Sequence, residues 1–307
     1  MPKDKIIFII GPTGTGKTEV GLGLSHFLPC EFISADSMQI YKGMDIVTDK
    51  LPVPLRKKYP HYLVDVLLPT QEYSVADFCL AAQKAIGAIL KNKKTPVVIG
   101  GTGLYVNSLL YGIFKDNPAD PKVRSGLESK ARTEGIDLLY ERLKDVDPQA
   151  ADRISPHDNR RIIRALEVYE ITQKPISSLQ KNRSGLTQSH KVFLFGLRRE
   201  RADLYRRIEQ RVDFMINAGL LDEVRRLLRM KLSKTAYYCI GIREIQGCFK
   251  GQYELSEAIY LIKRNSRHFA KKQMTWFNKN KDIDWIDLKK GEDLSEVSRM
   301  IFNKTRD

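Results

Sequence analysis

One glycine-rich segment constrains this chain more than any other feature of its sequence. Residues 11–18 read Gly-Pro-Thr-Gly-Thr-Gly-Lys-Thr and directly follow the apolar run at 6–10. They complete the G-x-x-x-x-G-K-[ST] pattern of a phosphate loop, with a predicted strand before it and a predicted helix after it. Glycines let backbone N–H groups turn toward phosphate oxygens, and the positive end of the following helix adds to the attraction. The sequence therefore predicts a binding site for a phosphate chain, a diphosphate or longer.

Each position of this loop has a predicted task in holding that chain. The loop comprises Gly11, Pro12, Thr13, Gly14, Thr15, Gly16, Lys17 and Thr18. Lys17 supplies a mobile positive charge, and the Thr18 hydroxyl is placed to bind Mg²⁺, which prefers oxygen ligands. A chance glycine-rich turn is the alternative, and the complete motif with correct flanking elements argues against it. The loop does not by itself identify the phosphate compound.

The first 114 residues alternate apolar strands with helical segments, a pattern typical of βαβ units and a parallel sheet. Strands are predicted at 5–10, 31–35 and 96–99, and helices at about 17–27 and 74–91, the latter capped by Ser74. In open α/β sheets, ligands bind beyond the carboxyl ends of the strands. We therefore expect the phosphate loop, Asp36 and Thr102 to converge on one crevice.

The pattern changes near residue 115. From 122 to about 181 the chain is helical and highly charged without a strand signal, and an apolar strand returns at 191–197. The chain is helical again from 198 to about 278, and 284–287 resembles a last short strand. We predict an α/β fold with a P-loop NTPase-like parallel sheet core and a helical insertion domain. The core comprises 1–114 and 190–307, and the insertion comprises 115–189.

The chain is strongly basic, with a formal net charge of +15. This charge fits either a solvated basic surface or a polyanionic partner, nucleic acid first. The segment 258–281 favours nucleic acid, because it holds seven Lys and Arg residues and no Asp or Glu. Cations without partners repel one another unless an anion is present. Gln273 and Trp276 lie among them and offer hydrogen bonds and a stacking plane.

A second arginine-rich group follows the strand at 191–197. It includes Arg198, Arg199, Arg201, Arg206, Arg207 and Arg211. Acidic residues at 200, 203 and 209 are interleaved with these arginines, so we interpret this group as mostly salt-bridged surface.

The four cysteines are widely spaced, without a C-x-x-C pair or a histidine at ligand spacing. A zinc site or a disulfide framework is therefore not expected, and the pattern suits a reducing cytoplasm. The apolar run near the N-terminus is too short for a signal peptide or a membrane span. We expect a soluble cytoplasmic protein.

Asp36 and Thr102 each have two interpretations at this stage. Asp36 follows a strand, which suits a general base or a Mg²⁺ partner, but aspartate also caps helices. Thr102 lies in the glycine turn at 100–105, whose backbone either approaches a ligand closely or forms a plain tight turn.

With these residues in view, the chain resembles the bacterial tRNA dimethylallyltransferases, also called tRNA isopentenyltransferases. The similarity covers essentially the whole chain, and its ordered set of motifs is more specific than the phosphate loop alone. These motifs are 11–18, 36–41, 60–65, 73–78, 100–105, 160–167, 240–244 and 270–277. The resemblance implies a nucleotide-kinase-like core with a helical insertion, and it favours a monomer.

The resemblance also implies an activity and its partners. Such enzymes transfer a dimethylallyl group from dimethylallyl diphosphate to the exocyclic N6 amine of adenosine-37, beside the tRNA anticodon. The phosphate loop would then hold a diphosphate leaving group rather than ATP, with Mg²⁺ as cofactor. The insertion would help to grip the anticodon stem-loop, and no membrane would be involved.

Individual roles follow by the same resemblance. Asp36 is expected to accept the amine proton, with Lys17, Thr102 and Arg124 at the reaction centre. Ser37, Met38 and Gln39 are expected to hold the extruded base. The remaining expected tRNA contacts are Arg160, Arg161, Arg164, Gly241, Arg243, Arg267, Lys271, Lys272, Gln273 and Trp276.

The chain departs from the family pattern at two places. The family usually shows Asp-Ile-Gly-Thr-Ala-Lys-Pro where residues 45–51 read Asp-Ile-Val-Thr-Asp-Lys-Leu. Val47 thus replaces glycine, and Asp49 replaces alanine. Lys272 replaces the usual arginine, which keeps the charge but loses bidentate geometry.

Two functions of other classes stay open from the residues alone. A P-loop kinase would hold ATP in the loop and use Asp36 to deprotonate a small substrate, but such a substrate does not need the basic segment at 258–281. A nucleic-acid-binding NTPase would use hydrolysis as a switch. No N-K-x-D motif occurs, which argues against a GTPase.

Overall fold

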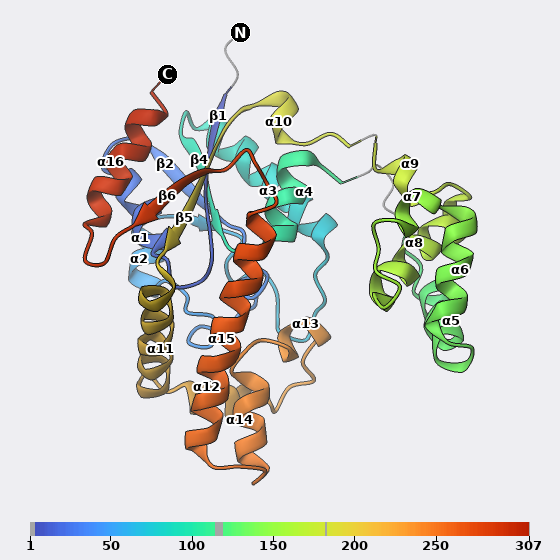
Figure 1. The fold of residues 1–307 in the computed structure, drawn as a ribbon. Coiled ribbons are helices and arrows are strands. Elements are labelled where there is room, and N and C mark those ends of the chain that lie inside the picture. The colour runs from blue at the N-terminus through green and yellow to red at the C-terminus, as the bar shows by residue number, and fades with distance from the viewer. Residues whose placement is uncertain (1–3, 114–118, 182, 307) are drawn as a thin grey trace. The chain divides into compact units, whose positions relative to one another are not determined.

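A six-stranded sheet with all strands parallel forms the centre of the core unit (Figure 1). The computed structural model describes residues 4–113, 119–181 and 183–306. The strands are β1 (Lys5–Ile10), β2 (Cys30–Ser34), β3 (His61–Tyr62), β4 (Thr95–Gly100), β5 (Lys191–Arg199) and β6 (Asp284–Leu288). Their order is β3-β2-β4-β1-β5-β6. The predicted parallel α/β core is confirmed, and β3 is a strand that the sequence pattern did not reveal.

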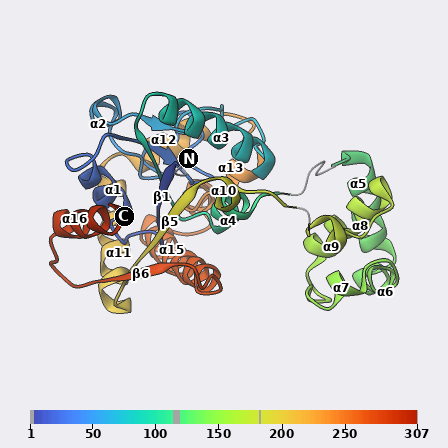
Figure 2. The ribbon, with the colours of Figure 1, turned by 90° about the horizontal axis from the view of Figure 1, so that it is seen from above.

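The helices of the core unit surround this sheet. They are α1 (Lys17–Leu24), α2 (Val53–Lys58), α3 (Val75–Lys91), α4 (Gly103–Tyr111), α11 (Arg201–Asn217), α12 (Leu220–Leu227), α13 (Lys234–Tyr237), α14 (Ile242–Phe249), α15 (Leu255–Phe277) and α16 (Leu294–Lys304). Helix α3 begins at the predicted cap, where Ser74 and Asp77 form a reciprocal capping box. Helix α16 was not predicted. It lies beside α1 in Figures 1 and 2, and Ser298 Oγ donates to the Val20 carbonyl at 2.9 Å.

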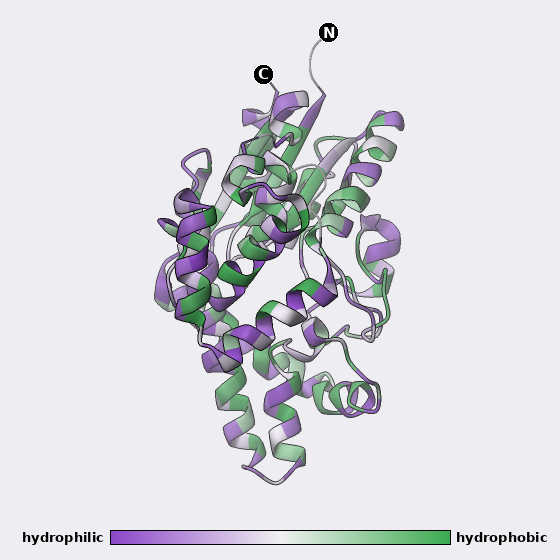
Figure 3. Cartoon of the chain, turned by 90° about the vertical axis from the view of Figure 1, so that its right-hand side faces the viewer, coloured by the Kyte–Doolittle hydropathy of each residue, from purple (hydrophilic) through white to green (hydrophobic). Residues whose placement is uncertain are grey.

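Strand β1 reads Lys-Ile-Ile-Phe-Ile-Ile and is buried after its first residue. A continuous apolar run of this kind is typical of a central parallel strand that is covered on both faces. Ile7 and Ile9 pack with Val20, Leu24 and Ile301 in the core beneath α1 and α16. Figure 3 shows the complementary pattern on the outer helices, which carry hydrophobic and hydrophilic stripes side by side.

The position of β4 decides which loops become neighbours. It pairs with β1 on one side and with β2 on the other, so β2 does not touch β1. All three strands run in the same direction. The segments that follow them, which contain the phosphate loop, Asp36 and Thr102, therefore emerge side by side at one edge of the sheet.

A second core lies below this edge and anchors the segment after β2. Ile40, Tyr41, Met44 and Val47 pack there against residues of α11, α12, α14 and α15. The Glu223 carboxylate, only 3% exposed as a residue, accepts the backbone N–H groups of residues 45, 46 and 47 at 2.8–3.0 Å. The segment that lines the crevice is thus held by C-terminal helices.

The chain divides into two units, and the second comprises Leu110–Gln188. Its helices are α5 (Pro121–Thr133), α6 (Ile136–Val146), α7 (Pro148–Ala151), α8 (Asn159–Thr172) and α9 (Ile176–Leu179), with α10 (Leu186–Ser189) at its end. Leu127, Leu143, Ile162 and Leu166 belong to a separate apolar core. The predicted insertion, 115–189, begins outside the described residues. None of the helices in the described ranges combines the length and apolar character that crossing a bilayer requires.

Candidate active site

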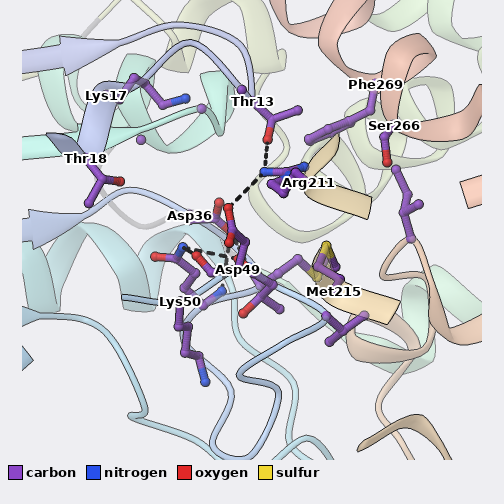
Figure 4. Close-up of a pocket in the computed structure, with 18 of the residues that line it drawn as sticks. Thr13, Lys17, Thr18, Asp36, Asp49, Lys50, Arg211, Met215, Ser266 and Phe269 are labelled. Atoms are coloured by element: carbon purple, nitrogen blue, oxygen red, sulfur yellow. Dashed lines mark hydrogen bonds and ion pairs between the residues drawn. The ribbon is translucent and has the colours of Figure 1, made fainter. Parts of the chain in front are cut away.

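A pocket of about 670 Å³ lies beyond the carboxyl ends of β1, β2 and β4 (Figure 4). Its walls come from the phosphate loop, the segments after β2 and β4, and helices α11 and α15. They include Thr13, Lys17, Asp36, Thr102, Arg211 and Phe269. The expected convergence of the phosphate loop, Asp36 and Thr102 is therefore observed. Ser37, Met38 and Gln39 line the same pocket.

The phosphate loop needs glycine at its first position for two reasons. Gly11 has φ +141°, and a Cβ there would lie 2.4 Å from the Leu197 carbonyl oxygen of β5. Gly14 and Gly16 also have positive φ values, 84° and 98°. Thr13, Gly14, Gly16, Lys17 and Thr18 face the pocket. Gly11, Pro12 and Thr15 are buried in the loop itself, where Thr15 Oγ1 donates to the Pro12 carbonyl at 2.9 Å.

Lys17 is folded back onto its own loop. Its Nζ donates to the Pro12 carbonyl at 2.7 Å. Burial lowers the pKa of Lys17 from 10.5 to about 8, although the nearby Asp36 carboxylate opposes the shift. A phosphate that enters the cradle would replace both the lost hydration and the carbonyl partner of this ammonium group.

Three arginines of the group at 198–211 support the loop from outside, in addition to the salt bridges that the sequence predicted. Arg199 Nε donates to the Thr15 carbonyl at 3.1 Å, and Arg207 Nε donates to the Gly14 carbonyl at 2.9 Å. Arg211 Nη1 donates to Thr13 Oγ1 at 2.6 Å. The sequence offered one signal for this role. Arg207 and Arg211 have i, i+4 spacing, which places them on one face of a helix, and that helix follows the strand next to β1. The predicted salt bridges are present: Arg198 pairs with Asp287, Arg199 and Arg206 with Asp203, Arg207 with Glu19, and Arg211 with Asp49.

Asp36 caps a turn rather than a helix, and its role as a base or Mg²⁺ partner stays a prediction. Its Oδ1 accepts the backbone N–H groups of Met38 at 2.8 Å and Gln39 at 3.3 Å, as a cap does. Its Oδ2 makes no hydrogen bond to another described residue, and the side chain lines the pocket. Thr102 Oγ1 accepts the Ser37 N–H at 3.1 Å. The turn after β4 is therefore bonded to the residue next to Asp36.

Gln39 connects the end of β2 to the segment that contains Val47 and Asp49, the two departures from the family pattern. Its Oε1 accepts from Ser34 Oγ at 3.1 Å, and its Nε2 donates to the carbonyls of Thr48 and Asp49 at 3.3 and 3.4 Å. Val47 is absent from the positive-φ residues, so its backbone does not require the glycine of the family pattern. Asp49 does have φ +52°, in the left-handed region that aspartate tolerates better than most residues.

Some cations of the basic segment at 258–281 form ion pairs that its sequence did not indicate. Lys263 pairs with Asp213, and Arg267 pairs with Glu209, both from the neighbouring helix α11. The expectation of cations without partners is therefore wrong for these two residues. Lys271 and Lys272 are exposed on α15.

Gln273 and Trp276 point into the protein. Gln273 is 8% exposed, and its amide bonds the Thr13 N–H and the Gly101 carbonyl, both at 2.9 Å. Gln273 thus has a structural role that its sequence did not reveal, and its expected RNA contact stays a prediction. Trp276 lies against Gly103, where a Cβ would come within 2.2 Å of the indole. Its Nε1 is buried without a hydrogen-bond partner among the described residues.

Gly241 and Arg243 lie at the start of α14. Gly241 has φ +110°, and its N–H donates to Glu244 Oε2 at 2.8 Å. The Arg243 guanidinium stacks over the Tyr238 ring, 4.5 Å from its centroid. Tyr238 itself lines the pocket, so this pair stands at the pocket wall.

The predicted residues of the insertion belong to the second unit. Arg124 and Arg164 both pair with Glu167, which is fully buried, at 2.9 and 2.6 Å. Arg161 lies 3.4 Å from Asp158, and Arg160 is exposed. The residues that line the pocket belong to the core unit, and the expected role of Arg124 at the reaction centre stays a prediction.

Comparison with known proteins identifies the family of this chain. The model of the IPP transferase family matches residues 39–280. The tRNA dimethylallyltransferase of Natranaerobius thermophilus is 43% identical over 303 residues, which cover 97% of this chain and 90% of that protein. The tRNA dimethylallyltransferase of Carboxydothermus hydrogenoformans is 44% identical over 303 residues, with 98% and 97% covered.

Solved structures that are similar to this chain come from the same family. The tRNA isopentenylpyrophosphate transferase of Bacillus halodurans has a TM-score of 0.70 and 36% identity, with 98% of this chain and 97% of that chain covered. A eukaryotic dimethylallyltransferase, solved acting on tRNA, has a TM-score of 0.79 and 28% identity, with 92% and 74% covered. The chain therefore belongs to the IPP transferase family and, within it, to the tRNA dimethylallyltransferases.

Proposed function

We propose that this tRNA dimethylallyltransferase moves the dimethylallyl group of dimethylallyl diphosphate to the N6 amine of adenosine-37, beside the tRNA anticodon. The products are N6-dimethylallyladenosine and diphosphate. One observation carries the proposal: a single pocket joins the phosphate loop to a carboxylate, Asp36, with an oxygen free to accept a proton. A phosphate donor and a proton-losing acceptor can thus meet there.

The donor end of the pocket suits a departing diphosphate. When the carbon–oxygen bond of the donor breaks, its electron pair stays on the diphosphate, whose negative charge grows. The loop N–H groups, Lys17 and Arg211 are positioned to stabilise that charge. The delocalised lone pair of an adenine amine makes it a weak nucleophile, so much of the activation has to come from this end.

The acceptor end suits an adenine that has left its stack, at a cost of a few kcal/mol. The amine nitrogen forms the new bond to the allylic carbon, and the proton that it loses passes to Asp36 Oδ2. Asp36 is held for this task by the Met38 and Gln39 N–H groups, and the Thr102–Ser37 hydrogen bond fixes the adjoining backbone.

The residues present fit Mg²⁺ as the cofactor. Thr18 lines the pocket at the start of α1, and its hydroxyl makes no hydrogen bond to another described residue. Groups of three or more His, Cys, Asp or Glu suited to a metal are absent from the described ranges, so diphosphate oxygens and water would complete the shell, as Mg²⁺ commonly requires. When bound, the ion would supply further charge stabilisation to the diphosphate.

The tRNA partner is supported by the exposed lysines of α15 and by the exposed basic residues of the second unit. A cytoplasmic location is part of the same proposal, since tRNA is modified where it is used, and all four cysteines are free thiols. The expectation of a monomer remains a prediction.

A mass-spectrometric assay tests the proposed reaction. Unmodified tRNA is incubated with the enzyme, Mg²⁺ and either dimethylallyl diphosphate or ATP, and the nucleosides are then analysed. We expect a prenyl-sized mass increase on adenosine with the first donor alone, and none in a tRNA that carries guanosine at position 37. Phosphoryl transfer from ATP, without prenylation, would identify a kinase and overturn the proposal.

A further inference from the structure

Asp49 places a carboxylate at the phosphate loop where the family pattern has alanine. Its side chain is 45% exposed and lines the pocket. The position is well supported: the Asp49 carbonyl accepts from Gln39 Nε2, and Glu223 holds the N–H groups of the preceding residues 45–47. The φ of +52° is compatible with aspartate. The carboxylate is therefore a built feature of the site.

The partner of this carboxylate is Arg211. Asp49 Oδ2 lies 3.3 Å from Arg211 Nη1, and the same Nη1 donates to Thr13 Oγ1 at 2.6 Å (Figure 4). One guanidinium nitrogen is thus shared between the phosphate loop and Asp49. The Arg211 side chain is 26% exposed and faces the pocket, so it is accessible to a ligand in the cradle.

A diphosphate in the cradle would compete for this guanidinium. Planar guanidinium groups can bind phosphate oxygens through two hydrogen bonds, whereas Asp49 offers Arg211 a single contact. The Asp49–Arg211 pair is half-exposed and 3.3 Å long, so it is weak enough to be displaced. After displacement, the Asp49 charge stays close to the bound anion. Asp49 and Arg211 are both near enough to Lys17 to influence its titration, which places all three in one electrostatic group.

We propose that Asp49 is a positioning residue that competes with the donor's diphosphate for Arg211 and thereby weakens diphosphate binding. It competes for the guanidinium before the donor enters and repels the anion afterwards. Relative to a family member with alanine, the enzyme would bind donor less tightly and release product diphosphate faster. The donor's identity rests on the proposed function, whereas the competition itself requires only a diphosphate in the phosphate loop.

Titration calorimetry with inorganic diphosphate and Mg²⁺ tests the proposal on the full chain. Asp49→Ala should bind diphosphate roughly two- to fivefold more tightly than the wild type, the range expected from an exposed ion pair. Asp49→Asn, which suits the left-handed backbone, should show a similar gain because it removes only the charge. The gain should shrink at high salt. If Asp49 had only a structural role, both variants would bind diphosphate more weakly than the wild type.

Asp213→Ala is the matched control. Asp213 is on the same helix as Arg211, is 53% exposed and pairs with Lys263, but it does not line the pocket. Its loss should leave diphosphate affinity unchanged. In the prenyl-transfer assay, Asp49→Asn should lower the donor KM without raising kcat.

Two results would overturn the proposal, and they are distinguishable. Unchanged or weaker diphosphate binding in both folded Asp49 variants would refute the competition while leaving the proposed reaction intact. Failure of the folded wild type to bind diphosphate at all would refute the competition and the donor site together.

Discussion

Gln273 Oε1 accepts the backbone N–H of Thr13 at 2.9 Å, so helix α15 is bonded directly to the phosphate loop. The other end of the same amide donates to the Gly101 carbonyl at 2.9 Å. One side chain therefore ties together the two glycine turns that follow β1 and β4. Gly101 has to be glycine for this contact, because a Cβ there would lie 2.3 Å from Gln273 Nε2.

We predict that Gln273→Leu damages the donor site and not the RNA surface. The substitution leaves the Thr13 N–H and the Gly101 carbonyl without partners, at about 1–3 kcal/mol for each buried group. Chemical denaturation should show the stability loss, and calorimetry should show weaker diphosphate binding. The salt dependence of tRNA affinity should be unchanged. Thr275→Val, on an exposed position of the same helix, should change stability by less than about 0.5 kcal/mol.

Asp36→Asn should separate the two roles of this residue. The amide oxygen of asparagine can still accept the Met38 and Gln39 N–H groups, but the side chain can no longer take up a proton. We expect single-turnover transfer to fall by about 10²–10⁴-fold, with diphosphate and tRNA binding retained. A rate close to that of the wild type would remove Asp36 from the role of base.

Diphosphate binding should weaken as the pH rises through about 8, the pKa to which burial lowers Lys17. Above that pH the donor-free enzyme loses the ammonium charge that the anion would meet. Calorimetry across this range should show a fall in diphosphate affinity near pH 8. Lys17→Met should bind diphosphate weakly at every pH and should show no such fall. A step of equal size in the variant would assign the titration to another group.

The same lowered pKa has the opposite effect on stability. Between about 8 and 10.5, the unfolded chain retains a proton on Lys17 that the folded protein has lost. The free energy of unfolding should therefore rise with pH over this window as far as Lys17 contributes. Denaturation of the wild type and Lys17→Met, compared at both ends of the window, isolates this contribution.

Sequence reasoning succeeded where the chemistry is local. The run at 6–10 and the glycines that follow it specify a strand and a phosphate loop without help from distant residues, and Ser74 marks the start of a helix. Convergence of Asp36 and Thr102 followed from a general property of parallel sheets. The placement of β4 between β1 and β2 was not needed for that expectation, and no local pattern encodes it.

Long-range pairing explains what was missed. Gln273 and Thr13 are 260 positions apart, and Arg211 and Thr13 are 198 apart, so no spacing rule links them. The acidic residues that pair with Lys263 and Arg267 of α15 lie on α11. Counting charges within 258–281 alone does not include them. Tertiary contacts thus give Gln273, Lys263 and Arg267 partners within the protein, and they add contacts to the phosphate loop for three of the salt-bridged arginines.

Lys271 and Lys272 are the cations of α15 that we predict to contact RNA phosphates. Both are exposed, unlike Lys263 and Arg267, which α11 neutralises. Changing both lysines to glutamine should flatten the slope of log affinity against log salt by about 0.7–0.9 for each RNA phosphate that these lysines neutralise. Lys263→Gln, the control, should leave the slope unchanged because its charge is already paired. An unchanged slope in the variant that lacks both lysines would place the RNA elsewhere on the surface.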